Sequence, residues 1–162
     1  VEYFPEPEPY NFGEDLLKVP GLDGSGKMGK TEGNAIFLAD EPKVIQKKVM
    51  KAVTDAGPTE PNQEMDEPIK NIFTLMKVVS TEDTYNYFLD QYNTCKIRYG
   101  DMKKQLAQDI IEFTDPLREK IKEIKADDDY LKKVAEKGRE KARASAAKTV
   151  KEVRDIIGIK SF

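Results

Sequence analysis

Two lysines lie in a glycine-rich stretch near the start of this sequence, where residues 24–31 read "GSGKMGKT". The stretch satisfies the pattern G-x-x-x-x-G-K-[ST], in which backbone amides and a lysine hold the phosphates of a nucleotide. Lys27 and Lys30 are three residues apart, and the surrounding glycines let the backbone approach a phosphate closely. These residue types indicate phosphate chemistry and raise the hypothesis of a nucleotide triphosphatase.

The residues on either side of the stretch argue against a triphosphatase. In a triphosphatase, the phosphate loop connects a buried β-strand to the N-terminus of a helix, whose amides and dipole hold the phosphates. Pro20 and Gly21 fall where the strand should be, and Gly33 would interrupt the helix in its first turn. What remains is a mobile loop whose two ammonium groups could close over a polyphosphate and stabilise charge on the departing oxygens. A solvated surface loop without such a role is the alternative that the spacing leaves open.

Composition restricts the chemistry further. The 162-residue chain has no histidine, which excludes Ser-His-Asp and Cys-His catalysis and the usual zinc sites. Its single cysteine, Cys95, cannot form an internal disulfide and suits a reducing compartment, so we expect a cytoplasmic location. No apolar run approaches the roughly 18–20 residues of a membrane span, and no cluster of metal ligands is visible. We therefore expect neither a membrane partner nor a protein-bound metal.

The charge is unevenly distributed along the chain. The net charge is −3, yet residues 132–160 carry ten Lys and Arg residues against four acids. A basic end of this kind is either a polyanion-binding face or a solvated helix surface, and charge alone favours the second interpretation. The sequence does not determine which side chains would contact a nucleic acid.

The remaining pattern is helical. Residues 1–40 are rich in proline and glycine and are predicted to be irregular. After them, apolar residues recur at steps of three and four and predict five helices that share one core. These apolar stripes cover residues 45–56, 69–79, 85–92, 102–124 and 131–157. The fold class is therefore mainly α, a helical bundle over 41–162 preceded by an irregular glycine-rich segment.

Several residues mark the predicted ends of these helices. Asp40 is the expected N-cap of the first helix, and Gly57 and Pro58 its end. Residues 80–83 supply capping chemistry for the third helix, residues 127–129 begin the last one, and Gly158 ends it. Gly100 predicts a break, and Pro116 predicts a kink in the long helix or a split capped by Asp115.

One segment resembles a known family. Residues 20–38, "PGLDGSGKMGKTEGNAIFL", resemble the K-M-S-K-S signature loop of class I aminoacyl-tRNA synthetases, with Lys27-Met28-Gly29-Lys30-Thr31 in its place. The residues before and after the loop are similar to those of the tryptophan-specific family. Similar stretches recur along essentially the whole chain, at residues 51–55, 71–73, 106–108 and 116–118 and in the alanine-rich final helix. The chain thus resembles the C-terminal part of a bacterial-type tryptophanyl-tRNA synthetase.

The resemblance implies a division of the chain and an activity. Residues 1–40 would be the end of a Rossmann catalytic domain with the signature loop at 27–31, and residues 41–162 a helical anticodon-binding domain. The full-length enzyme would use ATP with Mg²⁺ to form tryptophanyl-adenylate and would transfer the acyl group to tRNA(Trp). Full-length members of the family are cytoplasmic homodimers. Lys27 and Lys30 would be catalytic, and residues 27–31 together would bind ATP. Met28 would be a hydrophobic anchor for the closed loop, and Gly29 would act through its backbone amide. Thr31 would substitute for a missing serine.

The sequence also departs from the family pattern. Gly29 and Thr31 replace two serines, which leaves their effect on ATP affinity open. A K-F-G-K-T loop is typical of tyrosyl-tRNA synthetases, so that family is an alternative, as are a non-catalytic helical RNA-binding module and a helical interaction protein. No H-I-G-H-like element or strand–helix alternation is present, so we expect a fragment that is inactive alone and lacks the tryptophan pocket. The oligomeric state of such a fragment is left open.

Overall fold

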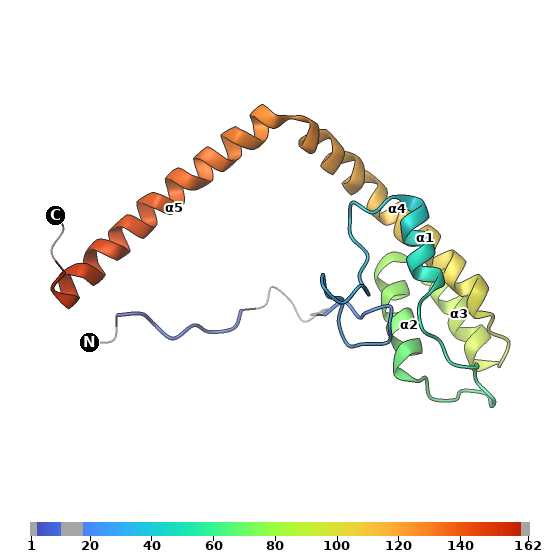
Figure 1. Ribbon diagram of the computed structural model, residues 1–162. Coiled ribbons are helices and arrows are strands. Elements are labelled where there is room, and N and C mark those ends of the chain that lie inside the picture. The colour runs from blue at the N-terminus through green and yellow to red at the C-terminus, as the bar shows by residue number, and fades with distance from the viewer. Residues whose placement is uncertain (1–2, 11–17, 160–162) are drawn as a thin grey trace. The chain divides into compact units, whose positions relative to one another are not determined.

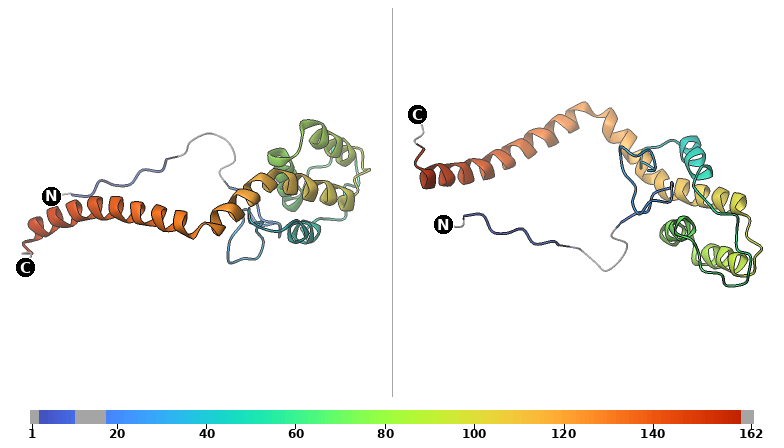
Figure 2. Two further views of the ribbon diagram at one scale, coloured as in Figure 1. Left: turned by 90° about the horizontal axis from the view of Figure 1, so that it is seen from above. Right: turned by 60° about the horizontal axis from the view of Figure 1, so that its bottom comes forward.

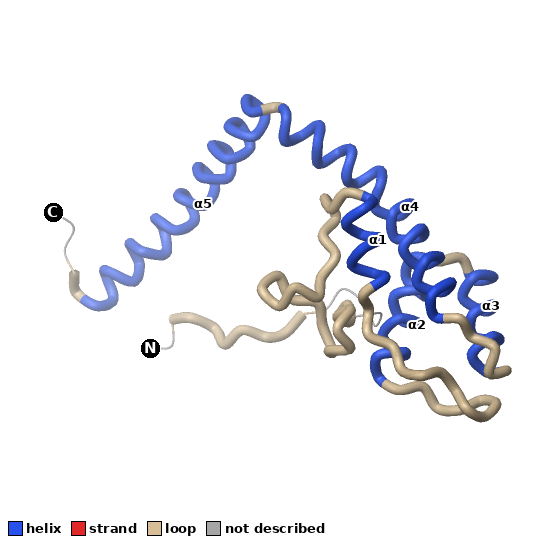
Figure 3. Tube along the Cα trace, turned by 45° about the vertical axis from the view of Figure 1, so that its right-hand side comes forward, coloured by secondary structure: helices blue, strands red, loops and turns tan. Residues whose placement is uncertain are grey.

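The computed structural model describes residues 3–10 and 18–159, and within them it contains five helices and no strand (Figures 1 and 3). The helices are α1 (Pro42–Met50), α2 (Glu67–Val79), α3 (Glu82–Asn93), α4 (Tyr99–Ala126) and α5 (Asp128–Ile157). The prediction of a helical region after an irregular segment is confirmed for these residues. The predicted segment 1–40 includes residues 1–2 and 11–17, which lie outside the described residues. Every helix in the described ranges is too short or too polar to span a bilayer.

Three of the predicted helix ends are confirmed by capping geometry. The side chains of Thr81 and Asp127 each accept a hydrogen bond from the backbone N–H three residues later, at 3.2 and 2.8 Å. Gly158 ends α5 in the left-handed conformation, with φ of 75°. Asp40 was predicted to cap α1, but Glu41 occupies the N-cap position and makes no side-chain cap bond. The prediction failed because the Asp40 carboxylate is held by other partners, described below.

The first helix is shorter than the apolar stripe over residues 45–56 predicted. The helix ends at Met50 with a tight turn, in which Ala52 N–H donates to the carbonyl oxygen of Val49, and two tertiary hydrogen bonds hold the residues that follow. Val53 N–H donates to the carbonyl oxygen of Leu22 at 2.9 Å. The Lys103 ammonium donates to the carbonyl oxygen of Ala52 at 2.7 Å. These bonds come from residues distant in sequence, so helical periodicity could not reveal them.

Helix α4 differs from its prediction at two positions. It continues past Pro116 without the proposed split at Asp115. Gly100 lies in its first turn, and the chain turns instead before it, where Cys95 has a φ of 56°. Near the proline, the Thr114 hydroxyl donates to the carbonyl of Ile110 at 2.8 Å, a bond that keeps this buried side chain satisfied inside the helix.

The chain divides into two compact units, residues 1–116 and 117–162, and the hydrophobic core lies in the first. Figure 2 shows α1, α2, α3 and the first part of α4 side by side in both views. The buried apolar residues are Leu22, Ile45, Val49, Ala52, Ile69, Ile72, Phe73, Leu75, Met76, Phe88, Tyr92, Met102, Leu106, Ala107 and Ile110. Leu22 is the one member of this core cluster that precedes the helices, so it fixes the glycine-rich segment to them.

Helix α5 does not belong to this core, and the prediction that its stripe over 131–157 is core is wrong. None of its described residues is buried. Helical spacing shows only that apolar residues share a face of the helix, and it does not show what that face contacts.

Candidate phosphate-binding loop

The glycine-rich loop, residues 18–41, forms turns and extended pieces without a strand or a helix. The exclusion of a triphosphatase phosphate loop is therefore confirmed, since such a loop needs a strand before it and a helix immediately after it. Leu22 anchors the loop in the core, and its N–H donates to the carbonyl oxygen of Asn34 at 3.1 Å. Asn71 of α2 donates from its side chain to the carbonyl oxygen of Ser25 at 3.1 Å. The loop is thus attached to the helices at Leu22, through the core, and at Ser25, through Asn71 of α2.

Asn34 organises the interior of the loop. Its side-chain amide donates to Asp23 Oδ1 at 3.0 Å, to Ser25 Oγ at 2.9 Å and to the carbonyl oxygen of Lys27 at 3.1 Å. Its Oδ1 accepts from Gly29 N–H at 2.9 Å. Only 4% of Asn34 is exposed. A buried amide that satisfies both its donors and its acceptor in this way fixes the path of the backbone around Lys27.

Asp23 supports the same network from the exposed side. Its Oδ1 accepts from Ser25 N–H at 3.0 Å as well as from Asn34. Hydrogen bonds from Ser25, and then from Asn34, hold the pKa of Asp23 below the ordinary aspartate value. The ionised carboxylate is therefore the form that the folded loop prefers.

We expect the loop to loosen in acid as Asp23 becomes protonated. Because its pKa is lowered in the folded state, its stabilising effect is complete above the ordinary pKa of the unfolded chain and is lost as pH falls through the folded pKa. The measurement is the chemical shift of the Ser25 amide by NMR as a function of pH, with a midpoint expected below 3.8, the ordinary value. Asp23→Asn should abolish the titration, and a wild-type midpoint at or above the ordinary value would contradict the assignment.

The two lysines of the predicted site are exposed, and the ammonium group of neither makes a hydrogen bond or ion pair with another described residue. Lys27 lines a small open pocket of about 370 Å³ together with Lys18, Ser25, Gly26 and Glu32. Lys30 follows in the next turn and does not line that pocket. The structure therefore brings Lys27 next to Lys18, and leaves the Lys30 ammonium available to a ligand.

The other three residues of the predicted site differ in their surroundings. Met28 is partly buried and packs against the core cluster. The N–H of Gly29, which the family resemblance assigns to the triphosphate, donates to Asn34 in this structure. A Cβ atom at Gly29 would lie 2.8 Å from the carboxyl carbon of Glu32, so a serine here would require that exposed side chain to move. Thr31 is exposed.

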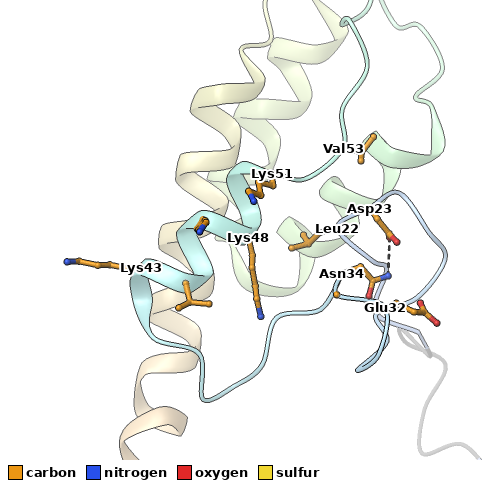
Figure 4. Close-up of a pocket in the computed structure, with 11 residues that line it drawn as sticks. Leu22, Asp23, Glu32, Asn34, Lys43, Lys48, Lys51 and Val53 are labelled. Atoms are coloured by element: carbon orange, nitrogen blue, oxygen red, sulfur yellow. Dashed lines mark hydrogen bonds between the residues drawn. The ribbon is translucent and has the colours of Figure 1, made fainter.

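Two features of the site were not predicted from the sequence. The organising role of Asn34 was not recognised, because a single asparagine after a glycine carries no periodic signal. The second feature is an open pocket of about 650 Å³ between the loop and α1 (Figure 4). Lysines at positions 43, 47, 48 and 51 line it, and the spacing of four residues between 43, 47 and 51 was a signal that could have identified those three.

Comparison with known proteins places this loop and its helices in a family. The family described as "tRNA synthetases class I (W and Y)" matches residues 4–115, and the chain belongs to this family. Two curated relatives are tryptophan–tRNA ligases. The ligase of Porphyromonas gingivalis is 59% identical over 99% of this chain and 49% of its own length. The ligase of Fusobacterium nucleatum is 34% identical over 98% of this chain and 47% of its own length.

A solved structure agrees with this result. The tryptophanyl-tRNA synthetase of Campylobacter jejuni, complexed with ADP and tryptophan, is 26% identical with a TM-score of 0.69. The match covers 90% of this chain and 45% of that protein. The chain thus spans about half the length of the relatives it matches.

Proposed function

We propose that this chain is the C-terminal part of a tryptophan–tRNA ligase. The observation that carries the proposal is the 59% identity to one such ligase over 99% of the chain. In the full-length protein, the carboxylate of tryptophan would attack the α-phosphorus of ATP, giving tryptophanyl-adenylate and pyrophosphate. The acyl group would then pass to the 3′-terminal adenosine of tRNA(Trp).

The proposal divides the chain by role. Residues 1–40 belong to the end of the Rossmann catalytic domain and carry the signature loop at 27–31. Residues 41–162 form the helical anticodon-binding domain. RNA loops are recognised by splayed bases that stack on flat side chains and by cations that contact phosphates, and an extended helical surface can present both.

The signature loop acts on the triphosphate by charge. Lys30 makes the principal contact to the leaving pyrophosphate, and Lys27 makes a supporting one. Both ammonium groups are exposed and without a partner among the described residues, so binding a phosphate would break no existing ion pair. Cations that are already positioned where charge develops lower the barrier without reorganisation at the moment of reaction. Met28 anchors the loop through its contact with the core, and Gly29 and Thr31 complete the site.

The remaining partners follow from the same assignment. ATP brings Mg²⁺ with it as part of the substrate. The full-length protein would form a homodimer, act in the cytoplasm and have no membrane partner. A tyrosine-specific enzyme and a non-catalytic RNA-binding module are not favoured, because the relatives named above are tryptophan–tRNA ligases.

Tryptophan-dependent exchange of pyrophosphate into ATP tests this function. The 162-residue chain alone should show no exchange, because the proposed amino-acid pocket lies outside it. The same sequence extended to the length of its relatives should exchange with tryptophan and acylate tRNA(Trp), with tyrosine as the negative control. Exchange by the isolated chain, or a preference for tyrosine in the extended protein, would refute the proposal.

A further inference from the structure

Three lysines follow one face of α1 and its C-terminal residue. Lys43, Lys47 and Lys51, here called the α1 lysine row, are four residues apart. A step of four residues places side chains on the same side of a helix, about 6 Å apart along its axis. All three are among the residues that line the pocket between α1 and the glycine-rich loop. Figure 4 labels Lys51 and Lys43, and the side chain of Lys43 points away from the loop. The row therefore places three cations along about 12 Å of the helix beside that pocket.

The charge of the row is not neutralised locally. None of its three lysines forms an ion pair with another residue in the described ranges. The neighbouring Lys48 differs, because its ammonium lies 2.6 Å from Asp40 Oδ2 and 2.9 Å from the carbonyl oxygen of Ala35. It also lies 4.7 Å from the centroid of the Phe37 ring. Lys48 thus fastens the loop to α1, and the row is left to face solvent.

The acids of the pocket do not cancel the row. Asp23 and Glu32 are the two carboxylates in its lining, against four lysines. The Asp23 carboxylate already accepts hydrogen bonds from Ser25 and Asn34. The pocket consequently keeps an excess of positive charge on the α1 side.

The pocket also has apolar lining residues. Leu22 is nearly buried, whereas Val44 and Val53 are 41% and 44% exposed. Lys27 lines the neighbouring pocket, which shares Glu32 with this one, and no lysine of the row lines that second pocket. A line of exposed cations beside apolar side chains complements a ligand with regularly spaced negative charges and less polar groups between them. The sugar–phosphate backbone of a nucleic acid has both features.

We propose that the α1 lysine row binds the phosphate backbone of RNA. The inference rests on the proposed function, which supplies tRNA(Trp) as the RNA. The contact positions the RNA and reads no base, because ammonium groups on phosphates carry no sequence information.

The test measures tRNA binding by the 162-residue chain and by the variant K43Q/K47Q/K51Q. Fluorescence anisotropy with a labelled tRNA(Trp) transcript gives the dissociation constant at several salt concentrations between 50 and 200 mM. Each lost phosphate contact lowers the slope of log K against log salt by about 0.7–0.9, so the triple variant should lower it by roughly 2–3. Its affinity near 0.1 M salt should fall by about tenfold or more.

The matched control removes the same charge elsewhere on exposed helix surface. Lys77 lies on α2, while Lys104 and Lys120 lie on α4, where they pair with Asp101 at 3.5 Å and Glu123 at 2.7 Å. K77Q/K104Q/K120Q should retain the wild-type slope to within about one unit. Circular dichroism monitors the fold of both triple variants. The single substitutions K43Q and K47Q, each expected to lower the slope by about 1, keep the test valid if the triple variant loses helicity.

The outcomes separate this inference from the function on which it rests. If the wild-type chain does not bind tRNA at all, both the inference and the proposed RNA-binding role fail. If it binds and the row variant keeps the wild-type slope, or if the control loses as much, the inference alone is overturned. In the protein extended to the length of its relatives, the row variant should leave pyrophosphate exchange unchanged, since exchange requires no tRNA.

Discussion

Lys30→Ala in the full-length protein is expected to slow the formation of tryptophanyl-adenylate by about 10²–10³-fold, the loss typical of removing one preorganised donor from a developing negative charge. The affinity for tryptophan should barely change, because Lys30 is assigned to the leaving pyrophosphate and not to the amino acid. Removing an interaction made mainly in the transition state lowers the rate without weakening substrate binding in proportion. Single-turnover measurement of adenylate formation, beside equilibrium binding of tryptophan, separates the two quantities.

Three variants control this experiment. Lys27→Ala should have a smaller effect, in keeping with its supporting role. Lys77→Ala removes an exposed lysine of α2 outside the loop and should leave the rate unchanged. Lys30→Arg keeps the charge and should retain part of the rate. An equal loss in adenylate formation and in acyl transfer to tRNA would count against the role assigned to Lys30, because pyrophosphate has departed before the second step.

Asn34→Ala should have the second-largest effect, although Asn34 need not contact the substrate. The substitution removes the side-chain bonds to Asp23, Ser25, Lys27 and Gly29, which hold the backbone on both sides of Met28. Misplacement of a catalytic group by about 1 Å can reduce the rate roughly 10²-fold, so adenylate formation should slow by about that factor. Most of the loss should fall on kcat, since Asn34 is assigned a positioning role. Breaking this buried network should also destabilise the chain by about 1–3 kcal/mol.

Asn34→Asp distinguishes positioning by hydrogen bonds from simple filling of space. The new carboxylate could still accept from Gly29 N–H, but it would lie about where Asn34 Nδ2 now lies, 3.0 Å from Asp23 Oδ1. Two carboxylates this close raise the pKa of the pair above its unfolded value. The variant should therefore be most stable below the unfolded pKa and lose stability as pH rises through the raised pKa of the folded state. Thermal unfolding between pH 4 and pH 8 measures this, and a melting temperature without that pH dependence would refute the network.

Much of the helical architecture could be predicted because the signals for it are local. Apolar steps of three and four residues identified the five helices of the described residues, and the capping residues Thr81, Asp127 and Gly158 identified three of the helix ends. Pro20 and Gly33 were enough to exclude a triphosphatase phosphate loop. Each of these signals acts within a few residues of the place where it is found.

Predictions failed where a distant residue changed the local outcome. The residues that follow α1 are held by bonds with Leu22 and Lys103, and Asp40 is drawn from its capping role to Lys48 and Phe37. The stripe on α5 was assigned to a core that it does not join. Periodicity could identify the apolar face in that helix but not its partner.

The sequence by itself therefore determined that the chain is helical, that its glycine-rich loop is not a triphosphatase loop, and which family it resembles. Tertiary structure alone decided how the loop is held, with Asn34 at its centre and Asn71 of α2 fixing Ser25. It also decided that the α1 lysine row, Lys43, Lys47 and Lys51, lines one pocket beside that loop. The physical reason is the separation along the sequence of the residues that interact. Helix formation depends on neighbours three or four residues apart, whereas buried hydrogen bonds and pockets join residues that only the folded chain brings together.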